Sequence, residues 1–263
     1  MKQQTLYTQD LDFSYDQVLV LNGISIEIAK GSVTALVGPN GCGKSTLLST
    51  LARLIKPNSG SVILNGREIA SQRTRDVARS LGFLPQNPVL PESTTVFELV
   101  SRGRYPHQPA FGGFTDIDFK AIDIAMEMTG TIDLSTRPVD SLSGGQRQRC
   151  WIALVLAQET PIILLDEPTS FLDLRYQLDT LRLLCRLAKH HGKTIIIALH
   201  DLNLAASHAD RMVFMRDGTV YANGITEDVF TSANIEAVFD VPVVITLHPE
   251  TGDSIFLPQK AKL

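Results

Sequence analysis

Short apolar runs recur along the chain and alternate with longer segments in which the apolar residues follow a helical spacing. These runs are Val33–Val37, Leu81–Pro85, Ile162–Leu165 and Thr194–Leu199. A continuous apolar run of this length, bounded by turn residues, is typical of a strand buried on both faces of a parallel sheet. Because these strands alternate with helix-length segments, we predict an α/β fold with a mostly parallel sheet and flanking helices.

The N-terminal part of the chain has strand signals separated by turn residues. We expect strands at Thr5–Phe13, Val18–Ile28 and Ser61–Leu64, the last followed by a turn at Asn65-Gly66. This region is therefore predicted to be antiparallel. From about Asn87 to Leu156 the pattern is helical, which we interpret as a helical subdomain inserted into the core.

The second half of the chain predicts two hairpins, which turn at Asp217-Gly218 and at Pro249–Gly252. Helices are expected near Lys44–Leu54 and Leu174–His190, with a short helix after His200. We interpret the whole chain as one domain with a core at 1–86 and 159–225, a helical subdomain at 87–158 and a C-terminal tail at 226–263.

Composition narrows the classes of protein that fit this pattern. The 263 residues have a hydrophobic content of 44%, enough for one large core or a core plus a subdomain. The net charge of −4 and the lack of a Lys/Arg block argue against a nucleic-acid partner. The apolar stretches fall short of the roughly 18 residues that cross a bilayer, so any membrane role is expected to come through a partner.

The N-terminal sequence and the cysteines indicate a cellular compartment. The N-terminus has no apolar signal-peptide region, and the three cysteines Cys42, Cys150 and Cys185 lack metal or redox spacing. An odd number of separated cysteines is expected of a reduced compartment, so we predict a cytoplasmic protein.

A phosphate-binding motif follows the first buried strand. Residues 38–46 read GPNGCGKST and fit G-x-x-x-x-G-K-[ST], in which backbone N–H groups surround a β-phosphate, Lys44 supplies a charge and Ser45 offers its hydroxyl to Mg²⁺. Cys42, beside Lys44 and near a helix start, is either a reactive thiolate or a small residue that fills the turn. The nucleotide-binding residues expected in this motif are Gly38, Pro39, Asn40, Gly41, Cys42, Gly43, Lys44, Ser45 and Thr46.

Polar residues with suitable chemistry stand at the carboxyl ends of the other buried strands, where open α/β sheets bind ligands. Asp166 is expected to hold Mg²⁺ through water, Glu167 to polarise the attacking water, and His200 to reach the γ-phosphate. The alternative for His200 is a core histidine, and for Gln86, at the end of its strand, a surface polar residue. Together with Lys44, these three residues, Glu167, His200 and Gln86, form the predicted catalytic set.

A second motif, LSGGQ at 142–146, stands far from the first in sequence. In this order, GPNGCGKST, Gln86, LSGGQ, LLDEP, SFLD and His200 resemble the nucleotide-binding subunits of ATP-binding cassette (ABC) transporters. That resemblance implies the P-loop NTPase fold of an ABC ATPase. The tracts RGRYPHQ at 102–108, VDSLSGGQRQR leading into Trp151 and EPTSFLDLRYQ at 167–177 are similar to importers of iron-siderophore complexes, with haem and cobalamin importers as near relatives.

The family resemblance also implies how the motifs are used. It implies a head-to-tail homodimer in which each ATP is held by the first motif of one subunit and by Ser143, Gly144, Gly145 and Gln146 of the other. It implies that Ser45, Gln86 and Asp166 serve Mg²⁺, and that Tyr15 stacks on adenine, the alternative being a half-buried strand tyrosine. Asp173 is expected near the nucleotide or as the N-cap of the helix at Leu174, and these roles can coexist.

The resemblance further implies partners and a location. A permease is expected to contact residues 87–108, where RGRYPHQ lies, and a substrate-binding protein acts indirectly. The subunit is then peripheral, on the cytoplasmic face of the inner membrane. Two alternatives stay open: another transporter subgroup, or a soluble ABC ATPase of DNA repair or translation, against which the single cassette and the lack of sustained heptads argue.

Overall fold

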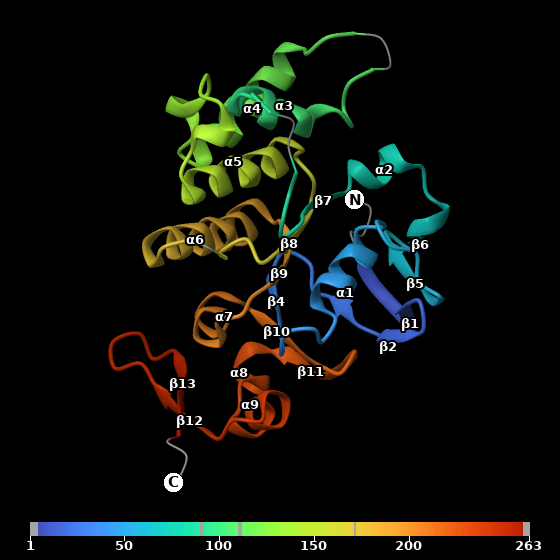
Figure 1. Cartoon of the computed structure of the whole chain (residues 1–263), viewed down its shortest axis with the longest axis vertical. Coiled ribbons are helices and arrows are strands. Elements are labelled where there is room, and N and C mark those ends of the chain that lie inside the picture. Colours follow the sequence, from blue (N-terminus) through green and yellow to red (C-terminus); the bar gives the residue numbers. More distant parts are fainter. Residues whose placement is uncertain (1–4, 90–91, 110–111, 171, 260–263) are drawn as a thin grey trace.

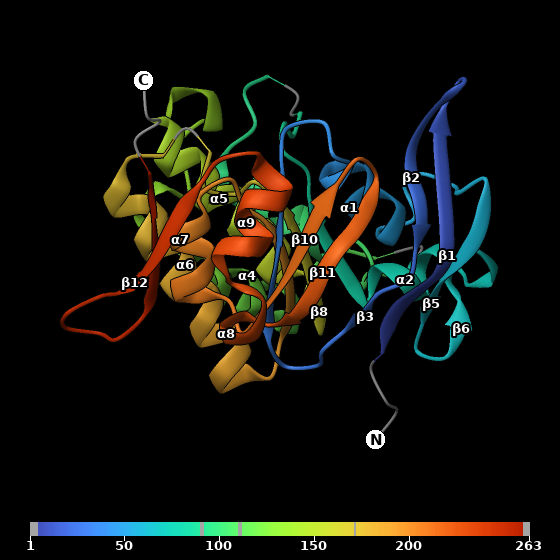
Figure 2. The same ribbon diagram turned by 90° about the horizontal axis from the view of Figure 1, so that it is seen from below.

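The computed structural model describes residues 5–89, 92–109, 112–170 and 172–259. Figures 1 and 2 show the arrangement of its helices and strands in two views. Phe171 of the SFLD run and residues 1–4 and 260–263 of the predicted terminal segments lie outside the described residues.

A six-stranded sheet runs through the middle of the molecule (Figure 1). Its strands β10, β4, β9, β8 and β7 pair in parallel in that order, and β11 pairs antiparallel with β10 at the edge. All residues of β4, β8 and β9 are buried, as the continuous apolar runs predicted. The bounds are β4 Val33–Val37, β7 Leu81–Leu84, β8 Ile162–Asp166, β9 Thr194–Ala198, β10 Arg211–Arg216 and β11 Thr219–Ile225.

An antiparallel sheet forms the N-terminal part, as predicted (Figure 2). Its strands are β1 Leu6–Tyr15, β2 Val18–Ile24, β3 Glu27–Ile28, β5 Ser59–Leu64 and β6 Arg67–Glu68. The single strand expected at Val18–Ile28 is two strands, because the Thr8 hydroxyl donates to the Ile24 carbonyl and accepts from the Ile26 N–H where the ladder is interrupted. The predicted turn at Asn65-Gly66 is present, and both residues have a positive φ, of 55° and 75°.

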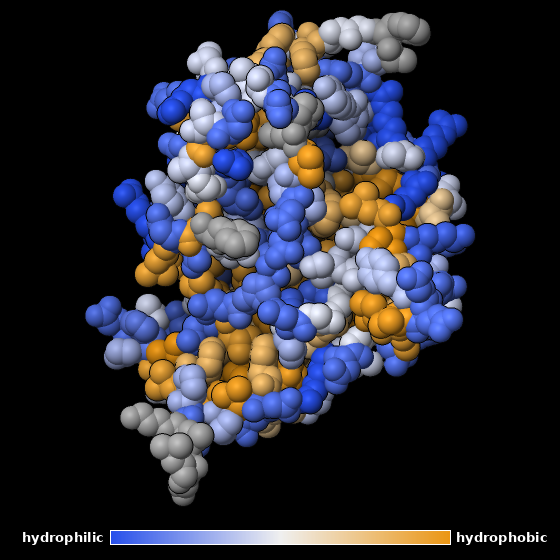
Figure 3. Space-filling view, in the orientation of Figure 1, coloured by the Kyte–Doolittle hydropathy of each residue, from blue (hydrophilic) through white to orange (hydrophobic). Residues whose placement is uncertain are grey.

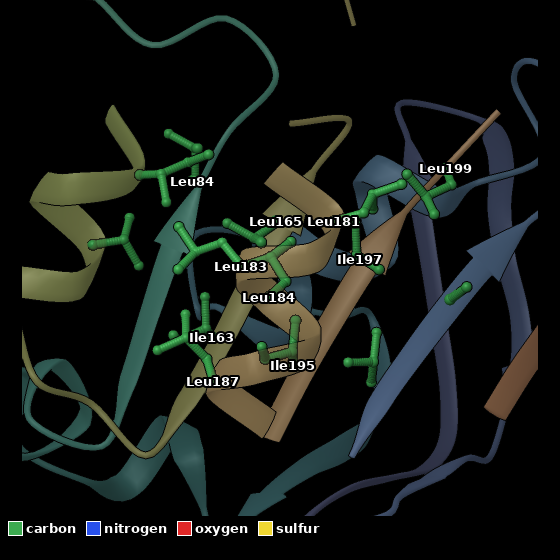
Figure 4. Close-up of a cluster of buried hydrophobic side chains, with 14 of the residues drawn as sticks. Leu84, Ile163, Leu165, Leu181, Leu183, Leu184, Leu187, Ile195, Ile197 and Leu199 are labelled. Carbon is green, nitrogen blue, oxygen red and sulfur yellow. The ribbon is translucent and has the colours of Figure 1, made fainter. Parts of the chain in front are cut away.

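The sheet has a hydrophobic core on each face, because successive side chains of a strand point to opposite sides. On one face, helix α1 (Lys44–Leu51) and the antiparallel sheet cover residues such as Leu36 and Leu164. On the other face, the leucines of α6 (Leu174–His191) pack against Ile163, Leu165, Ile195 and Ile197 (Figure 4). Each strand is therefore held by apolar contacts from both sides, which fixes its position in the sheet.

The C-terminal part contains more helix than the sequence pattern predicted. The expected short helix after His200 is α7 (Leu202–His208), and both hairpins are present, the second formed by β12 (Val243–Leu247) and β13 (Ser254–Pro258). The unpredicted short helices of this part are α8 Thr226–Val229 and α9 Ser232–Phe239, and a further one, α2 Thr74–Ala78, precedes β7. In Figure 3, hydrophobic side chains gather at the lower end of the view, where Figure 1 places α8, α9 and the β12–β13 hairpin.

Three helices form a layer beside β7, within the predicted helical segment. They are α3 (Val96–Ser101), α4 (Asp116–Met128) and α5 (Gly144–Ala157), and each begins with a capping box, at Thr95/Glu98, Thr115/Asp118 and Ser143/Gln146. Trp151 on α5 is buried in the core. Turns of 3₁₀ helix lie at Ile69–Ser71, Arg102–Arg104, Ile132–Leu134 and Val139–Ser141. No helix among the described residues is both long and apolar enough to span a membrane.

A buried ion pair holds this helical layer together. It involves Arg104 of the RGRYPHQ tract, so the expectation that this tract faces a permease does not hold for Arg104. The Arg104 side chain is 3% exposed, and its Nε donates to Asp118 Oδ1 at 2.9 Å. Its Nη1 donates to the Ala157 carbonyl at 2.6 Å and to Glu159 Oε2 at 2.7 Å. The Thr115 backbone N–H and the Arg104 guanidinium lower the pKa of Asp118 to about 2. Arg104 is thus a structural residue and does not face a partner.

We predict that Arg104→Ala lowers the free energy of unfolding by roughly 3 kcal/mol, because it leaves the Asp118 carboxylate buried without its cation. Urea denaturation followed by circular dichroism measures the change. The matched control is Arg175→Ala, which removes an exposed pair with Asp179 at 3.9 Å and should cost less than about 1 kcal/mol. Equal losses in the two variants would contradict the structural role.

Candidate functional site

The loop between β4 and α1 is shaped by two glycines that admit no side chain. A Cβ on Gly38 would lie 2.2 Å from the Met215 carbonyl oxygen. Gly43 has a φ of 103°, and a Cβ there would lie 2.9 Å from the Val20 carbonyl oxygen. Backbone atoms of β2 and β10 therefore press on the loop from outside, and the glycines keep its N–H groups in the tight curve that a phosphate needs.

Lys44 and Ser45 begin helix α1 and reach into the site. The Lys44 side chain is buried, and its Nζ donates to the Gly38 carbonyl at 2.8 Å and to the Pro39 carbonyl at 3.0 Å. The Ser45 hydroxyl donates to Asp166 Oδ1 at 3.0 Å. The helix start, the lysine charge and a hydroxyl beside a carboxylate thus meet in one place, as the motif predicted.

Glu167 has three hydrogen-bond partners and an unusual backbone. It has a φ of 52°, which a residue with a side chain rarely adopts, and its side chain is buried. Gln86 Nε2 donates to Oε2 at 2.6 Å, and His200 Nε2 lies 2.5 Å from Oε1. The Ser170 hydroxyl also donates to Oε2, at 3.1 Å. The carboxylate is therefore held in one orientation by Gln86, Ser170 and His200.

Ser170 was not identified from the sequence. It lies in the EPTSFLD run, but a serine in a loop carries no signal of its own, and only the turn geometry brings it to Glu167. Its backbone N–H donates to the Glu167 carbonyl at 3.1 Å, which closes this turn. The hydroxyl is then on the same side as the carboxylate.

Asp166 lies at the end of β8 in a buried position. Burial raises the pKa of Asp166, the hydrogen bond from Ser45 opposes the shift, and the neighbouring Glu167 adds to it. A divalent cation would favour the ionised form. Ser45 and Asp166 supply oxygen donors of the kind that Mg²⁺ prefers, so the residues fit that ion. Within the described residues no three or more His, Cys, Asp or Glu side chains are placed to hold a metal ion together, so other oxygens, such as those of phosphates and water, must complete its shell.

A surface pocket joins the predicted catalytic residues. Its lining brings the phosphate loop together with the ends of β7, β8 and β9, although these segments are far apart in sequence. The lining residues are Val20, Asn40, Gly41, Gly43, Lys44, Ser45, Thr46, Gln86, Glu167 and His200. The four predicted catalytic residues are thus in one place, and the role of Gln86 as a metal ligand stays a prediction.

Tyr15, Asp173 and the LSGGQ segment do not belong to this lining. Tyr15 ends β1, is 53% exposed and contacts the Phe13 ring edge-on at 4.8 Å. Its ring is free enough for stacking, and that role stays a prediction. Asp173 caps α6, since its Oδ1 accepts from the Tyr176 N–H at 3.1 Å, in agreement with the N-cap interpretation.

The LSGGQ segment forms the exposed start of α5. Ser143 is the N-cap, and its hydroxyl accepts from the Gln146 N–H while Gln146 Oε1 accepts from the Ser143 N–H at 3.1 Å. Ser143 and Gly144 are exposed, so this helix start is accessible to a ligand or another subunit. A helix start with exposed N–H groups attracts an anion.

Comparisons with known proteins agree with this geometry. The profile of the family described as ABC transporter matches residues 21–170. The iron(3+)-hydroxamate import ATP-binding protein of Bacillus subtilis is 44% identical over 96% of this chain and 94% of its own length. The achromobactin transport ATP-binding protein of Dickeya dadantii is 48% identical over 95% and 93%.

Solved structures show the same fold. An inward-facing metal-chelate type ABC transporter matches with a TM-score of 0.85 and 31% identity, over 98% of both chains. A dimeric bacterial ABC transporter cassette matches with a TM-score of 0.76 and 27% identity, over 84% of this chain and 98% of that chain. The predicted fold class, a mostly parallel core with an antiparallel N-terminal region and inserted helices, is confirmed.

The structure distinguishes between the two alternatives for Cys42, a reactive thiolate and a small residue that fills the turn. Its side chain is 5% exposed, and burial raises the pKa of its thiol, although Lys44 acts in the opposite direction. Of the two alternatives, the reactive thiolate does not agree with the structure, because the effect of burial outweighs that of the nearby charge. The alternative, a small residue filling the turn, agrees with the structure.

We therefore predict that native protein at pH 7 reacts with a maleimide at Cys42 at least about tenfold more slowly than urea-unfolded protein. The time course of labelling, read by peptide mass spectrometry, gives the rate for each cysteine. Cys42→Ser is the control that identifies the labelled peptide. Fast native labelling of Cys42 would contradict the buried position.

Proposed function

The chain belongs to the ABC transporter family, and from this premise we propose that it is the ATP-binding and hydrolysing subunit of an importer of iron-siderophore complexes. The observation that carries the enzymatic part is the position of Glu167, oriented by Gln86 and His200 in the pocket that Lys44 and Ser45 also line. The cargo is supported by relatives named for iron-hydroxamate import and achromobactin transport, each aligned over more than nine-tenths of this chain.

The residues of the pocket suit phosphoryl transfer to water. ATP hydrolysis needs an in-line water and neutralisation of charge on the transferred phosphoryl group. Lys44 and the N–H groups of the loop bind the phosphates, Glu167 accepts a proton from the attacking water, and His200 contacts the γ-phosphate. Ser45, Asp166 and Gln86 would hold Mg²⁺, which would supply positive charge beside the phosphates.

A second subunit completes the site. The pocket lining contains none of the LSGGQ residues, whereas Ser143 and Gly144 are exposed at the start of another helix. ABC cassettes dimerise, and a solved relative of this fold is dimeric. In a head-to-tail homodimer, Ser143–Gln146 of one chain cover the ATP held by Lys44 of the other. Tyr15 stacks on the adenine, and Asp173 lies near the interface.

The subunit works with membrane-spanning partners. ABC importer subunits of this kind associate with permease components on the cytoplasmic side of the membrane. In this proposal the contact lies in 87–108, where Val89 and Tyr105 are exposed and Arg104 is not. The subunit is peripheral to the inner membrane, a substrate-binding protein delivers the cargo to the permease, and the helical segment 87–158 moves as a subdomain against the core at 1–86 and 159–225, with a tail at 226–263.

We predict that Glu167→Gln retains ATP binding and loses hydrolysis by about 100-fold or more, because an amide does not accept the proton. Release of phosphate and binding of a fluorescent ATP analogue measure the two properties. Ser170→Ala is the matched control, since it removes one hydrogen bond to Glu167 and keeps the carboxylate. Turnover at the wild-type rate in Glu167→Gln would refute the assignment of the base.

The same variant tests the transport function. Cells that carry the importer with Glu167→Gln should lose uptake of ⁵⁵Fe-labelled ferric hydroxamate, while the wild-type subunit supports it. Uptake of labelled cobalamin by wild-type cells, with no uptake of ferric siderophores, would contradict the proposed cargo and leave the ATPase assignment intact.

We also predict that subunits with Lys44→Ala and subunits with Ser143→Arg complement each other, because their heterodimer retains one intact site. All chains carry Glu167→Gln so that ATP is not consumed, and two different tags allow heterodimers to be captured and detected selectively. ATP-dependent capture above that of either variant alone is expected. Its absence, once subunit exchange has been verified, would show that Lys44 and Ser143 do not serve the same ATP from different chains.

A further inference from the structure

The ring of Tyr176 lies directly against the LSGGQ helix. Tyr176 is in the first turn of α6, and Gly145 is in the first turn of α5. A Cβ on Gly145 would lie 3.1 Å from Cδ2, 3.4 Å from Cγ and 3.5 Å from Cε2 of this ring. Three neighbouring ring atoms at similar distances mean that the backbone of α5 rests on the ring itself, and the glycine makes this approach possible.

The same ring also contacts Arg149, one helical turn further along α5. Residues four apart lie on the same face of a helix, so Gly145 and Arg149 both face Tyr176. The guanidinium carbon of Arg149 lies 5.2 Å from the ring centroid, within the range of a cation–π contact. The first turns of α5 therefore lie along one aromatic ring.

Arg149 carries this contact on to the end of α4. Its Nη1 donates to the carbonyls of Thr129 at 3.3 Å and Gly130 at 3.2 Å. Its Nε is buried and has no hydrogen-bond partner. The guanidinium is held in place by the ring of Tyr176 and by the two carbonyls at the end of α4. The Tyr176 ring thus supports two helices of the helical layer at once.

The position of Tyr176 is in turn fixed by the segment that follows Glu167. The Tyr176 N–H donates to Asp173 Oδ1, and the neighbouring Gln177 Nε2 donates to the Leu172 carbonyl at 3.1 Å. Helix α6 packs on the central sheet through its leucines (Figure 4). The ring is therefore anchored to the core and not to the helical layer that it supports.

We propose that Tyr176 is a positioning residue whose ring sets the placement of the first turn of α5, and with it the Ser143–Gly145 donors offered to the ATP of the opposite subunit. This inference rests on the proposed head-to-tail function. A shift of the order of 1 Å in such donors is enough to weaken their grip on a transferring phosphoryl group. Only the face of the ring takes part, so the hydroxyl of Tyr176 is dispensable.

Removal of the Tyr176 ring is expected to damage only one of the two ATP sites of the dimer. Tyr176 supports the LSGGQ segment of its own chain, so removing its ring damages the site built on Lys44 of the partner. The site built on its own Lys44 keeps a complete LSGGQ segment from the partner. A general folding defect would not distinguish between the two sites.

The test uses full-length chains with Glu167→Gln and the tagged heterodimer capture described above. In the first arrangement one chain carries Tyr176→Leu and the other chain carries Lys44→Ala. In the second arrangement one chain carries both changes and the other chain carries neither. On different chains one complete site remains. On the same chain neither site is complete, so ATP-dependent capture should be about tenfold lower than in the first arrangement.

Two variants serve as controls. Tyr176→Phe keeps the ring and should give the capture seen without any change at 176, and Tyr221→Leu, an exposed tyrosine on β11, should have no effect in either arrangement. Equal capture for the two placements of Tyr176→Leu, whether high or low, would overturn the proposal, as would loss in Tyr176→Phe. The complementation of Lys44→Ala by Ser143→Arg tests the head-to-tail dimer separately. If only the role of Tyr176 is wrong, these two variants still complement each other, and if the dimer itself is wrong, they do not.

Discussion

Two adjacent carboxylates at the end of a fully buried strand, Asp166 and Glu167, place the strongest demand on this structure. Carboxylates removed from water need hydrogen bonds or opposite charges, and burial indeed raises the pKa of Asp166. The partners that meet this demand come from separate segments, since Ser45 bonds to Asp166 and both Gln86 and His200 bond to Glu167. Satisfying this pair therefore joins the phosphate loop to the ends of β7 and β9, and this junction is the pocket proposed to be catalytic.

The parts of this arrangement that could be predicted from the sequence are those set by burial over a whole element. Val33–Val37 was predicted with its observed bounds because every residue of β4 is buried, and the leucines of α6 follow a helical spacing for the same reason. Parallel strands end at one edge of the sheet, so the convergence of Asp166, Glu167 and His200 followed from the order of the elements alone.

The features that could not be predicted depend on contacts between distant segments. Short helices such as α9 have too few turns to show a periodic pattern, and their position is decided by packing against the C-terminal strands. The side chain of Arg104 is inside the helical layer because Asp118 and Ala157 are there, although its neighbours in sequence suggest a surface tract. For Cys42 the adjacent lysine was visible in the sequence and the burial was not, so the sequence could not decide between a reactive thiolate and a buried thiol whose pKa is raised.

In the proposed dimer, the position of Tyr176 connects the two roles of one chain. The segment that begins with Glu167, the proposed base, leads along the chain to the Tyr176 ring that lies against Gly145. In the proposed head-to-tail dimer Gly145 serves the ATP of the partner, so a movement of this segment in one site also moves the LSGGQ helix that belongs to the other. Arg149 extends the connection to α4, so the helical layer and the core share one contact near the start of α6. Under this proposal, closure of either site alters the placement of donors at both, which gives the two sites a physical reason to act together.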